Sequence, residues 1–425
     1  MSAIKRTFEI LEAVNNLGES TRMDVFQSFD GLKNWSFVFE WFNLICNLLW
    51  FVDFSSLDVL DEFFGMGDDS NPFMMLIWIL PIILFVFYGQ RIQLIITSRD
   101  IKKRMAELEQ FRNESRDDLI DYVKQKLTPN DDPTKKLDRF FEYFTIMPVD
   151  IDPNGIIPKI HHLVRSREDT TRKQIKSMFS EIDTLEITKV QNLLEIVATL
   201  QLLHKVVRHL FLTAKKQNNY PLILPLQMLL PFIMEQAEAL KDAVPAFKSG
   251  QPIGDGIGPL VVGGMMLDTK KQEAEFETVY SESEFDGRKL ILLKAEGPYA
   301  TVGRPGEATE SLVEKLKPNA IIMIDAALKL EGEDTGEVAQ GFGAAIGGIG
   351  TDRFKIEEVA TKYNIPVFAI VVRQSVKDAI TLMKKEISDQ TENVRNQVYE
   401  MITDNSNPND TVLVIGVGNT LGVAQ

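Results

Sequence analysis

The sequence predicts an α/β protein with a doubly wound, mostly parallel sheet at the carboxyl end, preceded by a helical domain and an N-terminal transmembrane anchor. Three observations predict this class. Strand and helix patterns alternate from about residue 276 to the end, apolar residues recur at helical spacing from 101 to about 251, and an uncharged apolar segment occupies 73–88. The expected domains are therefore a membrane anchor at 1–99, a helical stalk and domain at 100–250, and an α/β domain at 251–425.

Length and charge restrict the possible functions. At 425 residues the chain can form two or three domains with real cores. Its net charge of -15 argues against nucleic acid as a partner, because a phosphate backbone requires clustered Lys and Arg. Cys46 is the only cysteine, so neither an internal disulfide nor a cysteine metal site is possible.

The anchor is predicted from two apolar runs. The first extends from 73 to about 95 with Arg91 as its only charge, and roughly 20 residues are enough to cross a bilayer. Basic residues follow it, which favours a cytoplasmic location for the rest of the chain. The second run, 35–52, carries a polar stripe, so it either crosses the bilayer or lies in its interface. We therefore expect a lipid bilayer as a partner and a cell-membrane protein whose folded domains face the cytoplasm.

The helical domain follows with no recognisable site of its own. An amphipathic stalk begins at Ile101, a polar, proline-bounded hinge lies at 129–133, and a long apolar helix covers 187–212. Its four histidines do not have the spacing of metal ligands on a helix, where pairs lie three or four residues apart. We expect surface or satisfied histidines.

The last third has the strand and helix pattern of an α/β domain. A hairpin is expected across Asp286-Gly287, the commonest kind of two-residue turn. The expected order after the hairpin is helix 307–316, strand 318–325, helix 354–363, strand 366–372, helix 376–402 and strand 411–416.

One carboxylate ends the strand at 318–325. Ligands of parallel sheets bind beyond the carboxyl ends of the strands, which is where Asp325 falls. The simpler alternative is an Asp that caps the next turn. We favour the functional interpretation.

The two ends of the α/β domain are each incomplete. The strand at 411–416 runs into a glycine turn with no helix after it, whereas the glycine turn at 254–259 opens a helix with no parallel strand before it. We therefore hypothesise a circular permutation, in which the last strand places Asn419 beside Asp255. Asp255, Asp325 and Asn419 would then share one edge of the sheet, and we expect Asn419 to bind substrate there.

Two further features suggest substrate binding. Gly347, Gly348 and Gly350 precede the helix near 354 and can present N–H groups to a peptide carboxylate or an oxyanion. Arg304 stands near another helix start and is a candidate for binding an acidic substrate group, although a plain turn explains it equally well. The loop starts too far beyond its strand for a dinucleotide fingerprint, and a Ser-His-Asp triad is impossible because the domain has no histidine.

These stretches carry a family resemblance. The run Pro-Asn-Ala-Ile-Ile-Met-Ile-Asp-Ala-Ala, followed by Asp334-Thr-Gly336 and the glycine-rich loop, resembles the core of the spore germination protease family. Across the proposed permutation, Gly-Val-Gly-Asn with Gly-Asp-Gly-Ile-Gly-Pro also resembles that family and the hydrogenase maturation proteases. The chain as a whole resembles an archaeal membrane-anchored family of unknown function.

The resemblance implies a function. Asp255 and Asp325 match the two acidic positions of the germination protease, and a carboxylate pair can activate water and protonate a leaving amine. It thus implies a membrane-tethered, peptidase-like hydrolase that cuts a cytoplasmic peptide or protein and needs no cofactor. In the hydrogenase maturation branch such positions bind a divalent metal, so Asp255 and Asp325 are the expected ligands if there is one. The alternative is a non-catalytic membrane-anchored scaffold; the oligomeric state is left open.

Overall fold

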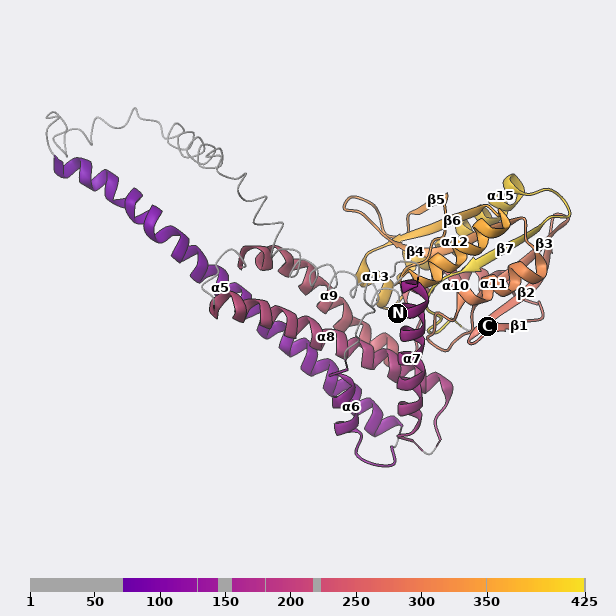
Figure 1. Ribbon diagram of the computed structural model, residues 1–425, viewed down its shortest axis with the longest axis horizontal. Helices are drawn as coiled ribbons and strands as arrows, with labels where there is room; N and C mark the ends of the chain where they lie inside the picture. Colours follow the sequence, from indigo (N-terminus) through magenta and orange to yellow (C-terminus); the bar gives the residue numbers. More distant parts are fainter. Residues whose placement is uncertain are drawn as a thin grey trace. The chain divides into compact units, whose positions relative to one another are not determined.

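The computed structural model describes residues 72–127, 129–143, 155–179, 181–216, 223–348 and 350–423, with side chains from residue 94 onward (Figure 1). Among these residues, those from Ile101 onward form one compact unit, and those before Ile101 belong to another.

The helical region is built from long helices whose apolar faces meet. Helix α9 packs against α8 in spite of two internal prolines, Pro231 and Pro245. Its buried apolar residues recur at helical spacing, as in Leu226, Leu230, Ile233 and Ala237. The helices are α5 (Pro72–Lys126), α6 (Thr134–Phe140), α7 (Ile156–Lys176), α8 (Thr184–Lys216) and α9 (Ile223–Ser249).

The prediction of a membrane anchor must be corrected. In the part of the chain that the structure describes, no helix is both long and apolar enough to cross a bilayer. The expected span at 73–95 forms the start of α5. This helix is 55 residues long in all and continues without a break through the basic residues that follow the span. The apolar run in the sequence is therefore one end of a much longer helix whose second half carries most of its charged residues. The second expected span, 35–52, lies outside the described residues.

The α/β domain contains a seven-stranded sheet in the order β1-β2-β3-β7-β4-β6-β5. Its strands are β1 (Gln272–Glu275), β2 (Thr278–Phe285), β3 (Arg288–Ala295), β4 (Ala320–Leu328), β5 (Val338–Phe342), β6 (Val367–Gln374) and β7 (Thr411–Gly416). Only the central pairings β3–β7, β7–β4 and β4–β6 are parallel, whereas β1–β2, β2–β3 and β5–β6 are antiparallel. The sheet is mixed, so the expectation of a mostly parallel sheet was wrong.

The physical reason for the mixed sheet lies at its two borders. The hairpin β2–β3 joins the sheet through β3, which is parallel to β7, and the pairings β2–β3 and β1–β2 beyond it are antiparallel. On the other side β5 runs antiparallel to β6, although its sequence, Val-Ala-Gln-Gly-Phe, is short and is interrupted by Gln and Gly, so that it did not predict a strand. Gly341, expected in a glycine-rich loop, lies in this strand.

Helices cover both faces of the sheet, as the alternating strand pattern requires (Figure 1). One core cluster joins the sheet to α10 (Ile257–Met265) and α15 (Gln390–Asn405), and the other joins the opposite face to α11 (Pro305–Leu316) and α12 (Thr351–Tyr363). A short 3-10 turn, η4 (Gly254–Gly256), precedes α10.

The single helix expected at 376–402 is divided in three. The pieces are α13 (Val376–Ile380), α14 (Lys385–Ser388) and α15. The break occurs because Thr381 is extended and the next residue, Leu382, forms a β-bridge with Ile253. This bridge ties the break to the segment that enters η4.

Candidate active site at the carboxyl edge of the central strands

Three segments far apart in the sequence converge at one edge of the sheet. In the parallel pair β4–β7, Ile324 lies opposite Gly416, the last residue of β7. The next residue, Val417, donates its N–H to the carbonyl of Ile324 at 2.8 Å. The turn after β7 therefore begins beside Asp325.

Two glycines allow α10 to approach this edge closely. A Cβ on Gly258 would lie 2.3 Å from the carbonyl oxygen of Val417 and 2.5 Å from that of Ile324. A Cβ on Gly418 would lie 1.9 Å from the carbonyl oxygen of Asp255, and the φ of Gly418 is +138°. Both positions exclude any larger residue, because real Cβ atoms do not come this near a backbone oxygen.

Asp255 is placed by the tail of the chain. Its side chain is 2% exposed, and Oδ2 accepts a hydrogen bond from the backbone N–H of Asn419 at 3.0 Å. The side chain of Gln374, at the end of β6, donates to the carbonyl of Gly254 at 3.0 Å. The turn η4 is therefore held by β6 and by the residues after β7, and it also contacts β4.

Asp325 lies in β4, one of the central strands of the sheet. It is 3% exposed, and Oδ1 accepts a hydrogen bond from the N–H of Ala326 at 2.8 Å. Ile321 and Met323 belong to the core cluster under α11 and α12, so by the period of two along a strand the side chain of Asp325 starts on that same face. The structure thus brings Asp255, Asn419 and Asp325 to one edge.

Asn419 has a different position from that expected of a substrate ligand. It is fully buried, its amide nitrogen donates to the carbonyl of Ala300 at 3.3 Å, and its side-chain oxygen accepts from the N–H of Leu421 at 2.9 Å. Its polar atoms hold neighbouring loops together, which leaves its backbone N–H as the group that reaches Asp255.

The glycine-rich loop leads to the start of α12. Gly350 precedes that helix with φ +85° and accepts the N–H of Phe354 at 2.9 Å, while Gly348 also has a positive φ. The apolar residues Ala344–Ile346 pack in the core cluster on the face where Asp325 starts. Gly347 lies between these two parts of the loop.

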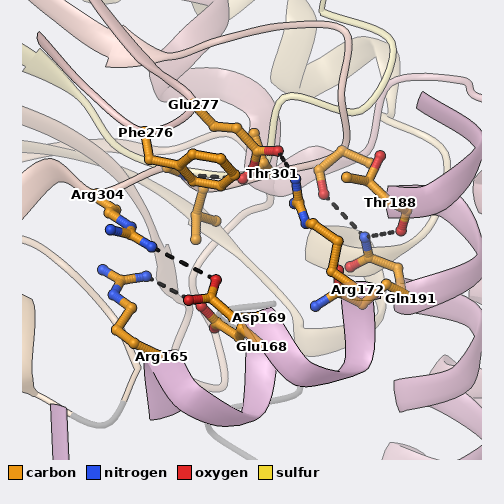
Figure 2. A pocket seen from close by; sticks show the side chains of 14 residues that line it. Arg165, Glu168, Asp169, Arg172, Thr188, Gln191, Phe276, Glu277, Thr301 and Arg304 are labelled. Carbon is orange, nitrogen blue, oxygen red and sulfur yellow. Dashed lines mark hydrogen bonds and ion pairs between the residues drawn. The ribbon is translucent and has the colours of Figure 1, made fainter. Parts of the chain in front are cut away.

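Arg304 points to a separate pocket (Figure 2). Figure 2 shows side chains from α7 and α8 facing side chains from the α/β domain. The guanidinium of Arg304 lies 5.0 Å from the centre of the Phe276 ring and 3.9 Å from Asp169, and Arg172 lies on the same ring, also at 5.0 Å. The cavity is small, about 40 Å³, which suits a single small polar group or a water rather than a whole ligand.

The loop 296–304 links this pocket to the aspartates. The carbonyl of Ala300 accepts hydrogen bonds from the side chains of Asn192, on α8, and Asn419 at 3.0 and 3.3 Å. Thr420 holds the same loop, since its hydroxyl donates to the carbonyl of Glu296 at 2.8 Å. One loop therefore forms a wall of the pocket and packs against the segment that positions Asp255.

Two buried charged groups near this edge have displaced pKa values. Lys294, in β3 opposite Gly416, is 1% exposed, and burial, with the nearby charge of Lys271, lowers its pKa to about 8. Burial raises the pKa of Asp378, but hydrogen bonds from Lys384, Ser375 and Thr335 outweigh it and hold the pKa below the usual value. Thr335 belongs to the Asp334-Thr-Gly336 stretch, which is thereby tied to α13.

Sequence reasoning missed one group of residues. His161 on α7, Glu307 on α11 and Asp352 on α12 each offer a ligand atom, and these three atoms lie within 4.8 Å of one another. No local spacing predicts this group, because its members are separated by up to 191 residues along the chain.

Comparison with known proteins gives two results. Residues 253–424 match the C-terminal domain of the DUF1512 family, a domain of unknown function, and residues 75–250 match the N-terminal domain of DUF1512, also of unknown function. A stretch of 132 residues is 32% identical to the germination proteases of Clostridium perfringens strains SM101 and 13. That match covers 30% of this chain and 38% of each relative. Neither result bears on an archaeal origin or on the circular permutation, which stay predictions.

Proposed function

For a chain that carries both domains of the DUF1512 family, we propose that the α/β domain is a peptidase-like hydrolase whose reacting groups are Asp255 and Asp325. One observation carries the proposal: the turn after β7 bonds to Asp255 and begins beside Asp325, so that the two carboxylates share an edge of the sheet. The partial similarity to germination proteases supports it.

The chemistry follows from two carboxylates in a region with little water. Of two neighbouring carboxyl groups, one can keep its proton while the other accepts a proton from water. The resulting hydroxide adds to the peptide carbonyl carbon, the C–N bond breaks, and the protonated carboxyl group supplies the proton that the leaving amine needs. No cofactor enters this scheme.

Access to the site requires movement. Both aspartates are almost fully buried, so a peptide reaches them only when a neighbouring segment is displaced. The side chains nearest to Gly256 belong to Val423 and the partly exposed Met383. Val423 and Met383 therefore line the turn that carries Asp255.

The proposed hydrolase is circularly permuted relative to the germination proteases. α10 packs directly against β7, which supplies the strand that the helix lacks in sequence order. Gly258 and Gly416 form the close crossing, since a Cβ on Gly416 would lie 2.5 Å from the carbonyl oxygen of Gly258.

A peptide-library assay tests the proposal. The full chain is incubated with fluorescence-quenched peptides, with and without EDTA, alongside Asp255→Asn and Asp325→Asn. Asn keeps the shape and a hydrogen-bond acceptor, so we expect both variants to fold and to lose cleavage. Asp404→Asn, at an exposed position on α15, is the matched control and should cleave like the wild type.

A binding or scaffold protein without catalysis is the second candidate. One observation favours it: both carboxylates accept hydrogen bonds from backbone N–H groups. An Asp with a purely structural role at a turn is held by bonds of this kind. The same assay separates the two. A wild type that cleaves no peptide, combined with aspartate variants that lose thermal stability, would support the scaffold.

A further inference from the structure

We propose that His161, Glu307 and Asp352 form a binding site for one divalent transition-metal ion, where α7 meets the N-termini of α11 and α12. Nε2 of His161 lies 3.0 Å from Oε1 of Glu307, and one ligand atom from each of the three residues falls within 4.8 Å of the others. Two atoms that coordinate one ion at about 2.0–2.2 Å lie at most about 4.4 Å apart, so the pair at 3.0 Å already fits one ion and a separation near 4.8 Å has to shorten slightly on binding.

The two carboxylates of this cluster share one cation among the ion pairs of the described residues. Arg165 is the ion-pair partner of both Glu307 and Asp352. Glu307 and Asp352 are only 16% and 17% exposed, so water compensates them poorly.

Arg165 holds the carboxylates in the orientation that a metal needs. Its Nη2 lies 3.3 Å from Oε2 of Glu307 and 3.6 Å from Oδ1 of Asp352. It thereby occupies one oxygen of Glu307 and leaves Oε1 directed at His161. Metal-ligating carboxylates are commonly oriented by such a hydrogen-bonding partner on their other oxygen.

Asp352 provides an independent sign of an absent partner. Its Oδ1 is buried with no hydrogen bond, and it lies where a Cβ on Gly306 would be only 2.8 Å away. The glycine at the start of α11 therefore makes room for this carboxylate next to Glu307. A buried carboxylate oxygen that receives only a distant ion pair is costly unless another cation supplies its missing interaction.

The donor set decides the class of ion. One imidazole nitrogen with two carboxylate oxygens suits Zn²⁺ or a similar first-row ion, whereas Mg²⁺ and Ca²⁺ favour oxygen ligands alone. Three protein ligands also leave room for water in a fourth position. The ion would join α7 of the helical region to two helices of the α/β domain, and the site shares no residue with the Asp255 and Asp325 pair.

Calorimetric titration of the EDTA-treated full chain with Zn²⁺ tests the site, with Mg²⁺ as a second titrant. We expect one Zn²⁺ per chain, a rise in the unfolding temperature on binding, and little response to Mg²⁺. His161→Gln should weaken binding by about 100-fold and abolish the rise. His162→Gln, which removes the adjacent exposed histidine, should bind like the wild type.

Two results would overturn the proposal: a wild type that takes up no Zn²⁺, or a folded His161→Gln that binds as tightly as the wild type. Asp325→Asn must keep its Zn²⁺ binding, because a loss there would assign the ion to the aspartate pair. Glu307→Gln provides a second variant, with circular dichroism as the check on folding.

Discussion

The α/β domain and the helical region bury polar side chains in different ways. In the α/β domain, Asp255, Asn419 and Thr420 bond to the backbone of segments more than a hundred residues away. On α8, Thr188 and Thr199 bond to carbonyls of their own helix, four residues earlier. These buried polar groups of the α/β domain therefore fix the arrangement of loops, whereas the two threonines form hydrogen bonds only within their own helix.

The difference teaches where to look for a site. Long-range hydrogen bonds of buried side chains concentrate at the carboxyl edge of β4 and β7, whereas α8 offers none of this kind apart from Asn192, which also reaches that edge through Ala300. A change at the edge should therefore disturb the whole α/β domain, and a change of a buried polar group on α8 should have a small, local effect.

The largest effect is expected at the crossing of α10 with the central strands. Gly258→Ala places a Cβ within 2.5 Å of the carbonyl oxygens of Ile324 and Val417. Both oxygens belong to the backbone at the ends of β4 and β7, which cannot move away without breaking the sheet. The substitution should therefore lower the free energy of unfolding by about 3 kcal/mol or more. Urea unfolding followed by circular dichroism measures it.

Gly264→Ala is the control for this substitution. The same helix has open space there, with only a flexible arginine atom at 3.9 Å, and alanine should stabilise the protein by about 0.5–1 kcal/mol. Equal effects of the two substitutions would contradict a tight crossing at Gly258.

A smaller, pH-dependent effect is expected at Lys294. Its folded pKa of about 8 lies below its ordinary 10.5, so the fold resists charging this lysine. The resulting penalty is fully present below about pH 8 and vanishes as the pH rises to 10.5. Lys294→Met should thus stabilise the protein at pH 7, by on the order of 2–3 kcal/mol.

Chemical denaturation of both proteins at pH 7, 8.5 and 10 measures this difference. The gain from Lys294→Met should shrink at each step. A gain that stays constant with pH would mean that packing, not charge, is responsible; a loss of stability at pH 7 would mean that the ammonium contributes a favourable interaction.

The smallest effect is expected on α8 at His204. Burial, with the charge of Arg112 nearby, lowers the pKa of this histidine, whose Nδ1 has no hydrogen-bond partner among the described residues. Because the unfolded chain takes up the proton first, stability is lost as the pH falls below about 6.5. His204→Leu should reduce this loss by less than about 1 kcal/mol.

Thermal unfolding between pH 5 and pH 8 compares His204→Leu with His209→Leu, an exposed histidine of the same helix. The second variant should follow the wild type. If both behave alike, the burial of His204 does not control its protonation.

Strong local patterns made much of the α/β fold predictable. The apolar runs of β4, β6 and β7 and the Asp286-Gly287 hairpin are found as strands. The edge strands β1 and β5 escaped prediction because they are short and neither is a continuous apolar run, so that pairing with a neighbouring strand determines them. The expected span at 73–95 was wrong, because no helix of the described residues is both long and apolar enough to cross a bilayer.

Only those features of the candidate site that follow from the order and direction of the strands were predictable. Strands that run parallel end at the same edge, so the position of Asp325 near the turn after β7 follows from the strand pattern. The burial of both aspartates and the use of the Asn419 side chain inside the fold depend on loop packing. The cluster around His161 depends on contacts between helices, which no local spacing encodes.

A double-mutant comparison of peptide cleavage tests the proposed carboxylate pair most directly. Initial rates are measured for the wild type, Asp255→Asn, Asp325→Asn and the double variant, on the best substrate of the library. If the carboxylates act as one unit, each single variant falls by about 100-fold or more and the double variant falls no further. Independent, multiplying losses, or a single variant that retains the wild-type rate, would contradict the account.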